Sequence, residues 1–174
     1  MKALFAGMLL VFLDVNIGID RYILDVLPDF VGYLLMTRGL KALYRQSGSF
    51  SKALPLAQGM IVFSGVLYVM DLLAVTIYDR FVSFCLGLAG LVCSLVLSHW
   101  IVSGVGDLER NRGWDLEGEK LRSMWLYAAV IQSIAYLCGW IPLVGQIGAV
   151  GAVVMHVCFL VAFYRSKDLY ETKN

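Results

Sequence analysis

Acidic and amide side chains interrupt an otherwise apolar stretch between residues 13 and 42, and one more acidic residue lies near the end of a later apolar run. Carboxylate and amide oxygens are ligands for hard cations. Like charges that gather near a low-dielectric medium bind a cation or share protons, because they cannot all remain ionised cheaply. We therefore predict an ion- or solute-binding site with five candidate ligands: Asp14, Asn16, Asp25, Asp29 and Asp71.

A purely structural role for these residues is the alternative. Pro28 lacks an N–H and has a fixed φ, so it suits the first position of a helix. Asp29 then falls in the first turn, where the positive end of the helix dipole favours a carboxylate. The other acidic residues could cap helices or pair with Arg21 and Arg80 in an outer loop. The spacing leaves both roles open.

The elements that position these residues are predicted to be transmembrane helices. Hydrophobic residues make up 60% of the 174 residues, charged residues make up 16%, and the mean hydropathy is +0.77. This composition indicates an all-α integral membrane bundle of about six helices in a single domain, residues 1–174. The expected helices are 3–17, 28–45, 53–78, 81–105, 118–141 and 143–165.

The first two helices are expected to be short and broken around the turn that contains Asp25 and Pro28. The apolar run from Ala3 to Leu13 spans only about 16 Å, which is roughly half of a bilayer's hydrocarbon core. Irregular backbone at membrane depth must line a cavity or be covered by protein, and broken segments are therefore frequent sites of ligand binding.

The same region resembles a known family. The residues that carry the likeness are Leu13-Asp14-x-Asn16-Ile17, then Leu27-Pro28-Asp29-Phe30-x-Gly32-Tyr33, then Gly39-Leu40. The pattern is similar to that of an uncharacterised family of small polytopic bacterial membrane proteins, and it covers about the first quarter of the chain. The resemblance implies a multi-pass membrane fold and a membrane location. It implies no activity and no site residue.

The distribution of basic residues predicts the orientation. With six spans, only Arg21 and Arg80 lie on one side of the membrane. By the positive-inside rule, both termini are expected on the cytoplasmic side of a bacterial inner membrane. The acidic turn then faces outward. The twelve basic residues expected on the cytoplasmic side are Lys2, Arg38, Lys41, Arg45, Lys52, Arg110, Arg112, Lys120, Arg122, Arg165, Lys167 and Lys173.

Other chemistry has weaker support in the sequence. His99 and His156 lie in different predicted spans and could ligate haem or a metal, but no third ligand accompanies them, so packing roles are expected. No cofactor is predicted. The four cysteines show no CxxC pairing and are expected to be free thiols. No basic run with interleaved aromatic residues is present, which argues against nucleic-acid binding.

The sequence supports three functional hypotheses. The first is a transporter, channel or solute-binding component that uses the acidic site, with membrane lipid and a cation or small solute as partners. The second is a scaffold or accessory subunit that packs against a membrane protein or a second copy of itself through small-residue faces. The third is a membrane enzyme acting on lipid. Familiar catalytic motifs are absent from the sequence, which argues against familiar enzymes but not against an intramembrane enzyme, whose catalytic residues are scattered along the chain.

Overall fold

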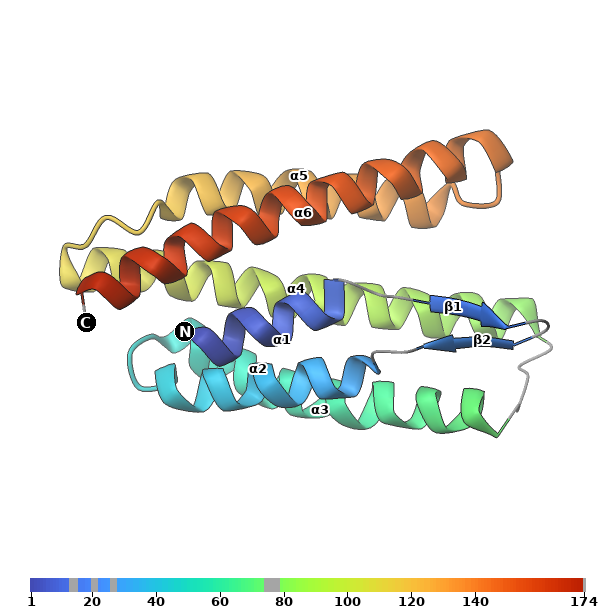
Figure 1. Cartoon of the computed structure of the whole chain (residues 1–174), viewed down its shortest axis with the longest axis horizontal. Helices are drawn as coiled ribbons and strands as arrows, with labels where there is room; N and C mark the ends of the chain where they lie inside the picture. The colour runs from blue at the N-terminus through green and yellow to red at the C-terminus, as the bar shows by residue number, and fades with distance from the viewer. Residues whose placement is uncertain (13–15, 20–21, 26–27, 74–78, 174) are drawn as a thin grey trace.

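The computed structural model describes residues 1–12, 16–19, 22–25, 28–73 and 79–173, with the backbone alone at 16–19, 22–25, 71 and 142. These residues form six helices and one small antiparallel hairpin (Figure 1), so the predicted all-α class is confirmed. The elements are α1 (Lys2–Phe12), β1 (Asn16–Ile19), β2 (Tyr22–Asp25), α2 (Asp29–Leu43), α3 (Gly48–Leu72), α4 (Arg80–Arg112), α5 (Gly118–Leu137) and α6 (Pro142–Lys173).

Among the described residues, three helical segments are long and apolar enough to cross a membrane: Gly48–Met70, Arg80–Arg112 and Leu143–Lys173. They correspond to α3, α4 and most of α6. Large apolar side chains along the same helices are exposed, among them Val62, Phe81 and Val150, as expected of surfaces that face lipid. These features indicate a membrane location.

Several helix bounds differ from the expected ones: α3 covers Gly48–Leu72 instead of 53–78, α5 ends at Leu137 instead of residue 141, and the ends of α1, α4 and α6 also differ. α1 covers Lys2–Phe12, and Asn16 and Ile17, which were expected in the first helix, lie in β1, where the β-branched Ile17 is favoured. α4 continues past residue 105 to Arg112 and ends at Gly113, whose φ of +63° suits a glycine helix cap. α6 continues past residue 165 to Lys173, because Tyr170 packs on Trp114.

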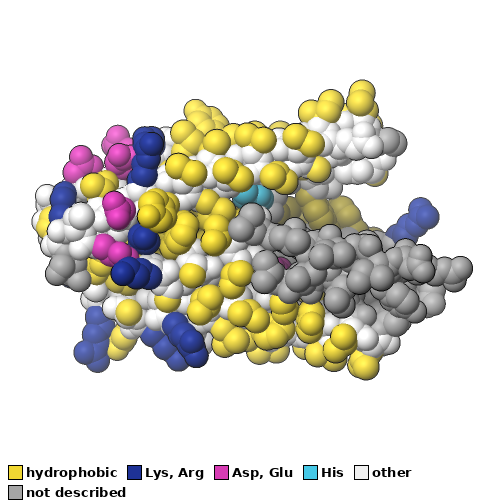
Figure 2. All heavy atoms as spheres, viewed as in Figure 1, with side chains coloured by type: hydrophobic (Ala, Val, Ile, Leu, Met, Phe, Trp, Pro, Cys, Tyr) yellow, Lys and Arg dark blue, Asp and Glu magenta, His cyan; other side chains and the backbone are white. Residues whose placement is uncertain are grey.

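The helices form two layers (Figure 1). α5 and α6 pair with each other in one layer, and α1 to α4 make up the other. Both termini lie at the same end, where Lys2 of α1 and Glu171 of α6 form an ion pair at 3.5 Å. Charged side chains on the face shown in Figure 2 gather mostly at this end, which we call the terminal end.

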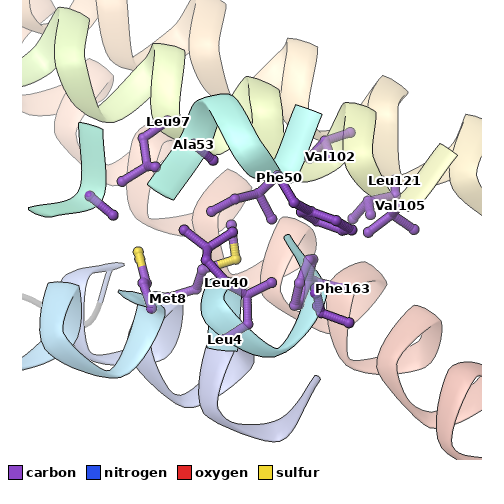
Figure 3. Packing of buried hydrophobic residues seen from close by; sticks show 14 of the residues in the cluster. Leu4, Met8, Leu40, Phe50, Ala53, Leu97, Val102, Val105, Leu121 and Phe163 are labelled. Carbon is purple, nitrogen blue, oxygen red and sulfur yellow. The ribbon is translucent and has the colours of Figure 1, made fainter. Parts of the chain in front are cut away.

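The apolar core also lies toward the terminal end (Figure 3). All six helices contribute fully buried side chains, and those of α2 to α6 come from the half nearest the termini. Leu4 of α1, Leu40 of α2 and Phe50 of α3 meet Val105 of α4 and Phe163 of α6 in one cluster. The bundle is therefore held together most tightly at one end.

Polar contacts fasten the loops of the terminal end. One carboxylate oxygen of Asp107 accepts hydrogen bonds from the hydroxyls of Ser47, at 2.5 Å, and Ser49, at 2.8 Å. Arg112 donates to the side-chain oxygen of Gln46 at 3.1 Å. These contacts tie the α2–α3 loop and the start of α3 to the end of α4.

Glycines allow α1 and α2 to cross closely. A Cβ atom added at Gly7 would lie 2.5 Å from the carbonyl oxygen of Gly32. A Cβ atom added at Gly39 would lie 2.6 Å from the backbone nitrogen of Leu4. Both obstacles are backbone atoms of the partner helix, which cannot move aside as a flexible side chain can. The crossing therefore requires small residues at these positions.

Gly39→Ala is expected to lower the free energy of unfolding by about 1–3 kcal/mol, the usual cost of overpacking a tight contact. The measurement is thermal unfolding of the purified protein in detergent. Gly59→Ala is the matched control, since it lies in α3 with no atom within 4 Å of an added Cβ. It should be neutral or slightly stabilising. Equal melting of Gly39→Ala and the parent protein would contradict the close crossing.

Candidate functional site

A cavity of about 610 Å³ lies between the helices, beyond the apolar core as seen from the terminal end. All six helices line it. The surface in Figure 2 is hollowed between the α5–α6 layer and the rest of the molecule, and a histidine side chain is visible at the inner end of the hollow. Seven side chains that line the cavity are polar: Asp29, Tyr33, Ser64, Ser94, Gln132, Tyr136 and His156.

α2 brings an acid and a phenol to the cavity. Asp29 and Tyr33 are four residues apart, so they lie on the same face of the helix. Tyr33 is buried and Asp29 is half-buried. Asp29 belongs to the first turn of α2, where the helix dipole stabilises a negative charge. The dipole therefore favours a charged carboxylate at the edge of the cavity.

An imidazole and an amide from the other layer form a pair. His156 Nε2 of α6 and Gln132 Oε1 of α5 lie 3.1 Å apart. The ring of Phe12 stacks on the His156 ring, with centroids 4.6 Å apart and an interplanar angle of 24°. Since α1, α5 and α6 each hold one member of this group, the imidazole has a fixed position on the cavity wall.

Tyr136 joins α5 to α4 on another wall. Its hydroxyl donates a hydrogen bond to the Phe84 carbonyl oxygen at 2.8 Å, and its ring stacks on that of Phe84, with centroids 5.5 Å apart. Gly87 makes room for the phenol, because a Cβ atom at this position would collide with the Tyr136 hydroxyl. The glycine thus sets where the phenol of Tyr136 lies.

The remainder of the lining is apolar and partly aromatic. Phe12 of α1 and Phe63 of α3 contribute rings, and Leu67, Leu86 and Leu91 contribute aliphatic surface. Ser64 donates its hydroxyl proton to the Met60 carbonyl oxygen of its own helix at 2.6 Å. The cavity is therefore mixed in character, with few polar groups on a largely apolar wall, as is usual for small-molecule sites.

The structure places the predicted ligands in different ways. Asp29 lines the cavity. Asn16 and Asp25 lie opposite each other in the register of the β1–β2 hairpin, and β2 packs against α3. Asp71 lies in the last turn of α3. Asp14 lies outside the described residues. A common site for all five therefore stays a prediction, and Asp29, the one candidate whose side chain the structure describes, lies at the cavity.

The two histidines have different surroundings. His156 lines the cavity, whereas the ring of His99 contacts that of Trp125, with centroids 4.8 Å apart. Within the part of the chain that the structure describes, no three His, Cys, Asp or Glu side chains are placed to hold a metal ion. The four cysteines, Cys85, Cys93, Cys138 and Cys158, are free thiols.

Several lining residues carry little signal in the sequence. Gln132 is a polar residue inside an apolar helix, and such residues are functional candidates in membrane proteins, so this rule could have identified it. Tyr33, Ser94 and Tyr136 are of types common in membrane helices. Their roles depend on which face of each helix meets the cavity.

Comparisons of the chain with protein-family models, with curated proteins and with solved structures gave no match. The function of the cavity must therefore be inferred from its own chemistry.

Proposed function

We propose that the protein is a small multi-pass membrane protein that binds a small solute in this cavity, as a transporter, a channel or a solute-binding component. The observation that carries the proposal is the convergence of a carboxylate, two phenols and an imidazole–amide pair on one cavity lined by all six helices. Polar and ionisable groups inside a membrane bundle are costly. A solute that pairs with them offsets part of that cost.

The proposal includes six membrane-crossing helices with both termini in the cytoplasm. α2 has 15 residues and spans only about 22 Å, less than the roughly 30 Å of a hydrocarbon core, so its Asp29 end would lie below the outer surface. The lysine and arginine side chains that gather at the terminal end support a cytoplasmic location of that end in a bacterial inner membrane. The cavity lies on the other side of the core and would then open outward.

Cysteine labelling tests the orientation. In a background without the four native cysteines, Asn111→Cys should react with a membrane-impermeant maleimide only from the cytoplasmic side. Arg80→Cys should react only from the outside. Both positions are exposed. Arg80 is preferable to Asp79, because the Asp79 side chain caps α4 by accepting from the Phe81 amide at 2.8 Å. Reversed sidedness would reject the proposed orientation.

A second labelling experiment tests the binding cavity itself. Ser94→Cys conserves side-chain size and places a thiol on the cavity wall. Thiol-specific reagents attack the thiolate, which requires contact with water. A small impermeant methanethiosulfonate should therefore modify Ser94→Cys from the outside.

Val92→Cys is the matched control for this experiment. Val92 lies on the same helix, is 50% exposed and does not line the cavity, so its thiol should face lipid and stay unreactive. A Ser94→Cys thiol that is as unreactive as the Val92→Cys thiol would reject a water-accessible solute site. That outcome would favour a scaffold or accessory subunit.

A further inference from the structure

Lys167 is a buried lysine near the end of α6, and its side chain is only 9% exposed. Among the residues that the structure describes, it has neither a carboxylate partner nor a hydrogen-bond acceptor. An ammonium group carries three N–H donors, and its removal from water is costly unless an opposite charge compensates it. The described chain therefore provides no ion-pair partner for this ammonium.

Two aromatic rings lie beside the ammonium instead. Lys167 Nζ is 4.2 Å from the centroid of the Tyr164 ring and 5.8 Å from that of the Phe5 ring. These rings contact each other edge to face, with centroids 5.4 Å apart, where α1 meets α6. Their π faces attract the cation and offset part of its desolvation cost. The Nζ atom is not among the fully enclosed polar atoms, so a group outside the bundle can reach it.

The acidic residues nearest in sequence do not neutralise Lys167. Glu171, one turn further along α6, pairs with Lys2 of α1 at 3.5 Å. Asp168 is exposed and forms no ion pair with a described residue. Every charged side chain of α1 and of the end of α6 is described. Basic residues outnumber acidic ones there, with Lys2, Arg165, Lys167 and Lys173 against Asp168 and Glu171.

The ammonium lies at the depth of the lipid headgroups. The part of α6 between Leu143 and Tyr164 has no charged residue and spans about 33 Å, close to the roughly 30 Å of a hydrocarbon core. Lys167 follows this span directly. Because its ammonium lies over Tyr164, three residues earlier, the side chain points back toward the hydrocarbon core. A lysine that only sought water would point the other way.

We propose that the phosphate of an anionic phospholipid pairs with Lys167 at this position. Hydrogen bonds from an ammonium group to a phosphate are charge-assisted, and they satisfy donors that the described chain leaves unused. Phosphatidylglycerol carries a net negative charge, whereas the phosphate of phosphatidylethanolamine is neutralised by the lipid's own ammonium. The basic excess around Lys167 favours the anionic lipid. The site goes beyond the proposed solute binding and does not depend on it, since Lys167 does not line the cavity.

An apolar strip beside Lys167 distinguishes a lipid from free phosphate. Val154, Val157, Val161 and Tyr164 recur at intervals of three or four residues, so they form one strip along α6. Their side chains are 54%, 49%, 51% and 48% exposed. The strip leads from the level of Lys167 into the apolar span, where the acyl chain of a lipid would lie. A phosphate without acyl chains gains nothing from this surface.

Native mass spectrometry of the purified full-length protein in detergent tests the site. The parent protein should bind dioleoylphosphatidylglycerol saturably, and it should bind dioleoylphosphatidylethanolamine, which has the same acyl chains, more weakly. Excess glycerol 3-phosphate should not displace the anionic lipid, because it lacks acyl chains. Lys167→Gln should weaken binding of dioleoylphosphatidylglycerol about 10-fold or more, the lower limit for loss of a hydrogen bond to a charged group.

Two further variants make the test specific. Lys52→Gln removes the same charge from an exposed lysine at the start of α3, at the same end of the bundle, and it should bind the anionic lipid as the parent does. Lys167→Met keeps a long apolar side chain between the rings of Phe5 and Tyr164, and it should lose binding as Lys167→Gln does. Lys167→Met keeps the proposal testable if Lys167→Gln does not fold.

Four results would overturn the lipid site. They are equal binding of the two lipids, unchanged affinity in the Lys167 variants, an equal loss in Lys52→Gln, and displacement of the lipid by glycerol 3-phosphate. The third would show attraction by surface charge alone, and the fourth would show a site for free phosphate. Outside labelling of Ser94→Cys is a separate measurement, so the solute-binding cavity and the lipid site can each be rejected while the other stands.

Discussion

Phe50→Ala is expected to destabilise the folded bundle by about 3–5 kcal/mol, the range for removing a fully buried aromatic side chain. Phe50 has 0% of its surface exposed and lies in the first turn of α3. Figure 3 shows its ring beside Val105 of α4 and Leu121 of α5. The ring fills the space over Gly104, where an added Cβ would lie 2.5 Å from Phe50 Cε1. Its loss would leave a cavity between three helices.

The same geometry provides a test that depends on the specific contact. Gly104→Ala alone should destabilise the protein, because its methyl group would meet the Phe50 ring. In combination with Phe50→Leu, the added methyl group should cost less, since residues in contact show non-additive effects. Unfolding in detergent measures both values. Strict additivity would contradict the packing of Phe50 on Gly104. Phe81→Ala, at a site 74% exposed, is a control that should change little.

The number and order of the helices could be predicted from hydropathy. Long apolar runs separated by polar residues are a strong signal, and the helices after residue 28 lie close to the expected positions. The ends were harder to predict, because tertiary contacts extend helices into polar sequence. Residues 106–112 look like a solvent loop by composition, but Asp107 binds Ser47 and Ser49, which stabilises α4 there.

The β1–β2 hairpin illustrates a different limit. The segment from Asn16 to Asp25 follows a short apolar helix, and continuation of that helix satisfies its backbone hydrogen bonds as well as strand pairing does. The β-branched residues Ile17, Ile19 and Ile23 favour strands. Such intrinsic preferences for the strand conformation are weak. They decide the structure only together with long-range contacts, such as the packing of β2 against α3.

The cavity could be predicted only in part. Asp29 was identifiable because a carboxylate within an apolar stretch is costly. Tyr33, Ser94 and Tyr136 are far apart in the sequence, and a membrane helix that is apolar all round gives no sign of its inward face. Hydropathy therefore finds the helices, whereas the residues that meet between them depend on packing.

The arrangement of core and cavity has a physical consequence. The buried apolar cluster and the Asp107 contacts hold the terminal end, and the cavity with its polar groups occupies the space beyond. The packing that stabilises the fold and the proposed solute site thus lie in different halves of the bundle. Substitutions in the terminal half should change unfolding, whereas substitutions at the cavity should change binding with a smaller effect on stability.

Trp125 links the two halves, because it lies on α5, the helix that also carries Gln132 and Tyr136 into the cavity. Its indole Nε1 donates to the Ser98 hydroxyl of α4 at 2.9 Å, and its ring contacts that of His99. This contact holds α5 against α4 at a point on the helix that precedes the cavity-lining residues Gln132 and Tyr136. Loss of the indole should therefore affect both stability and the cavity.

Trp125→Ala is expected to lower the free energy of unfolding by about 3 kcal/mol, the lower limit for such a truncation, because the side chain is only half-buried. Trp125→Phe keeps a ring against His99 and loses the hydrogen bond to Ser98, so it should cost only about 1 kcal/mol.

In the Ser94→Cys background, Trp125→Ala should also change the rate of outside labelling, because α5 loses its contact with α4. Trp125→Phe should leave that rate near the parent value. Equal melting of the parent and Trp125→Ala would show that α5 is held to α4 by other contacts, and the link between the two halves would be rejected.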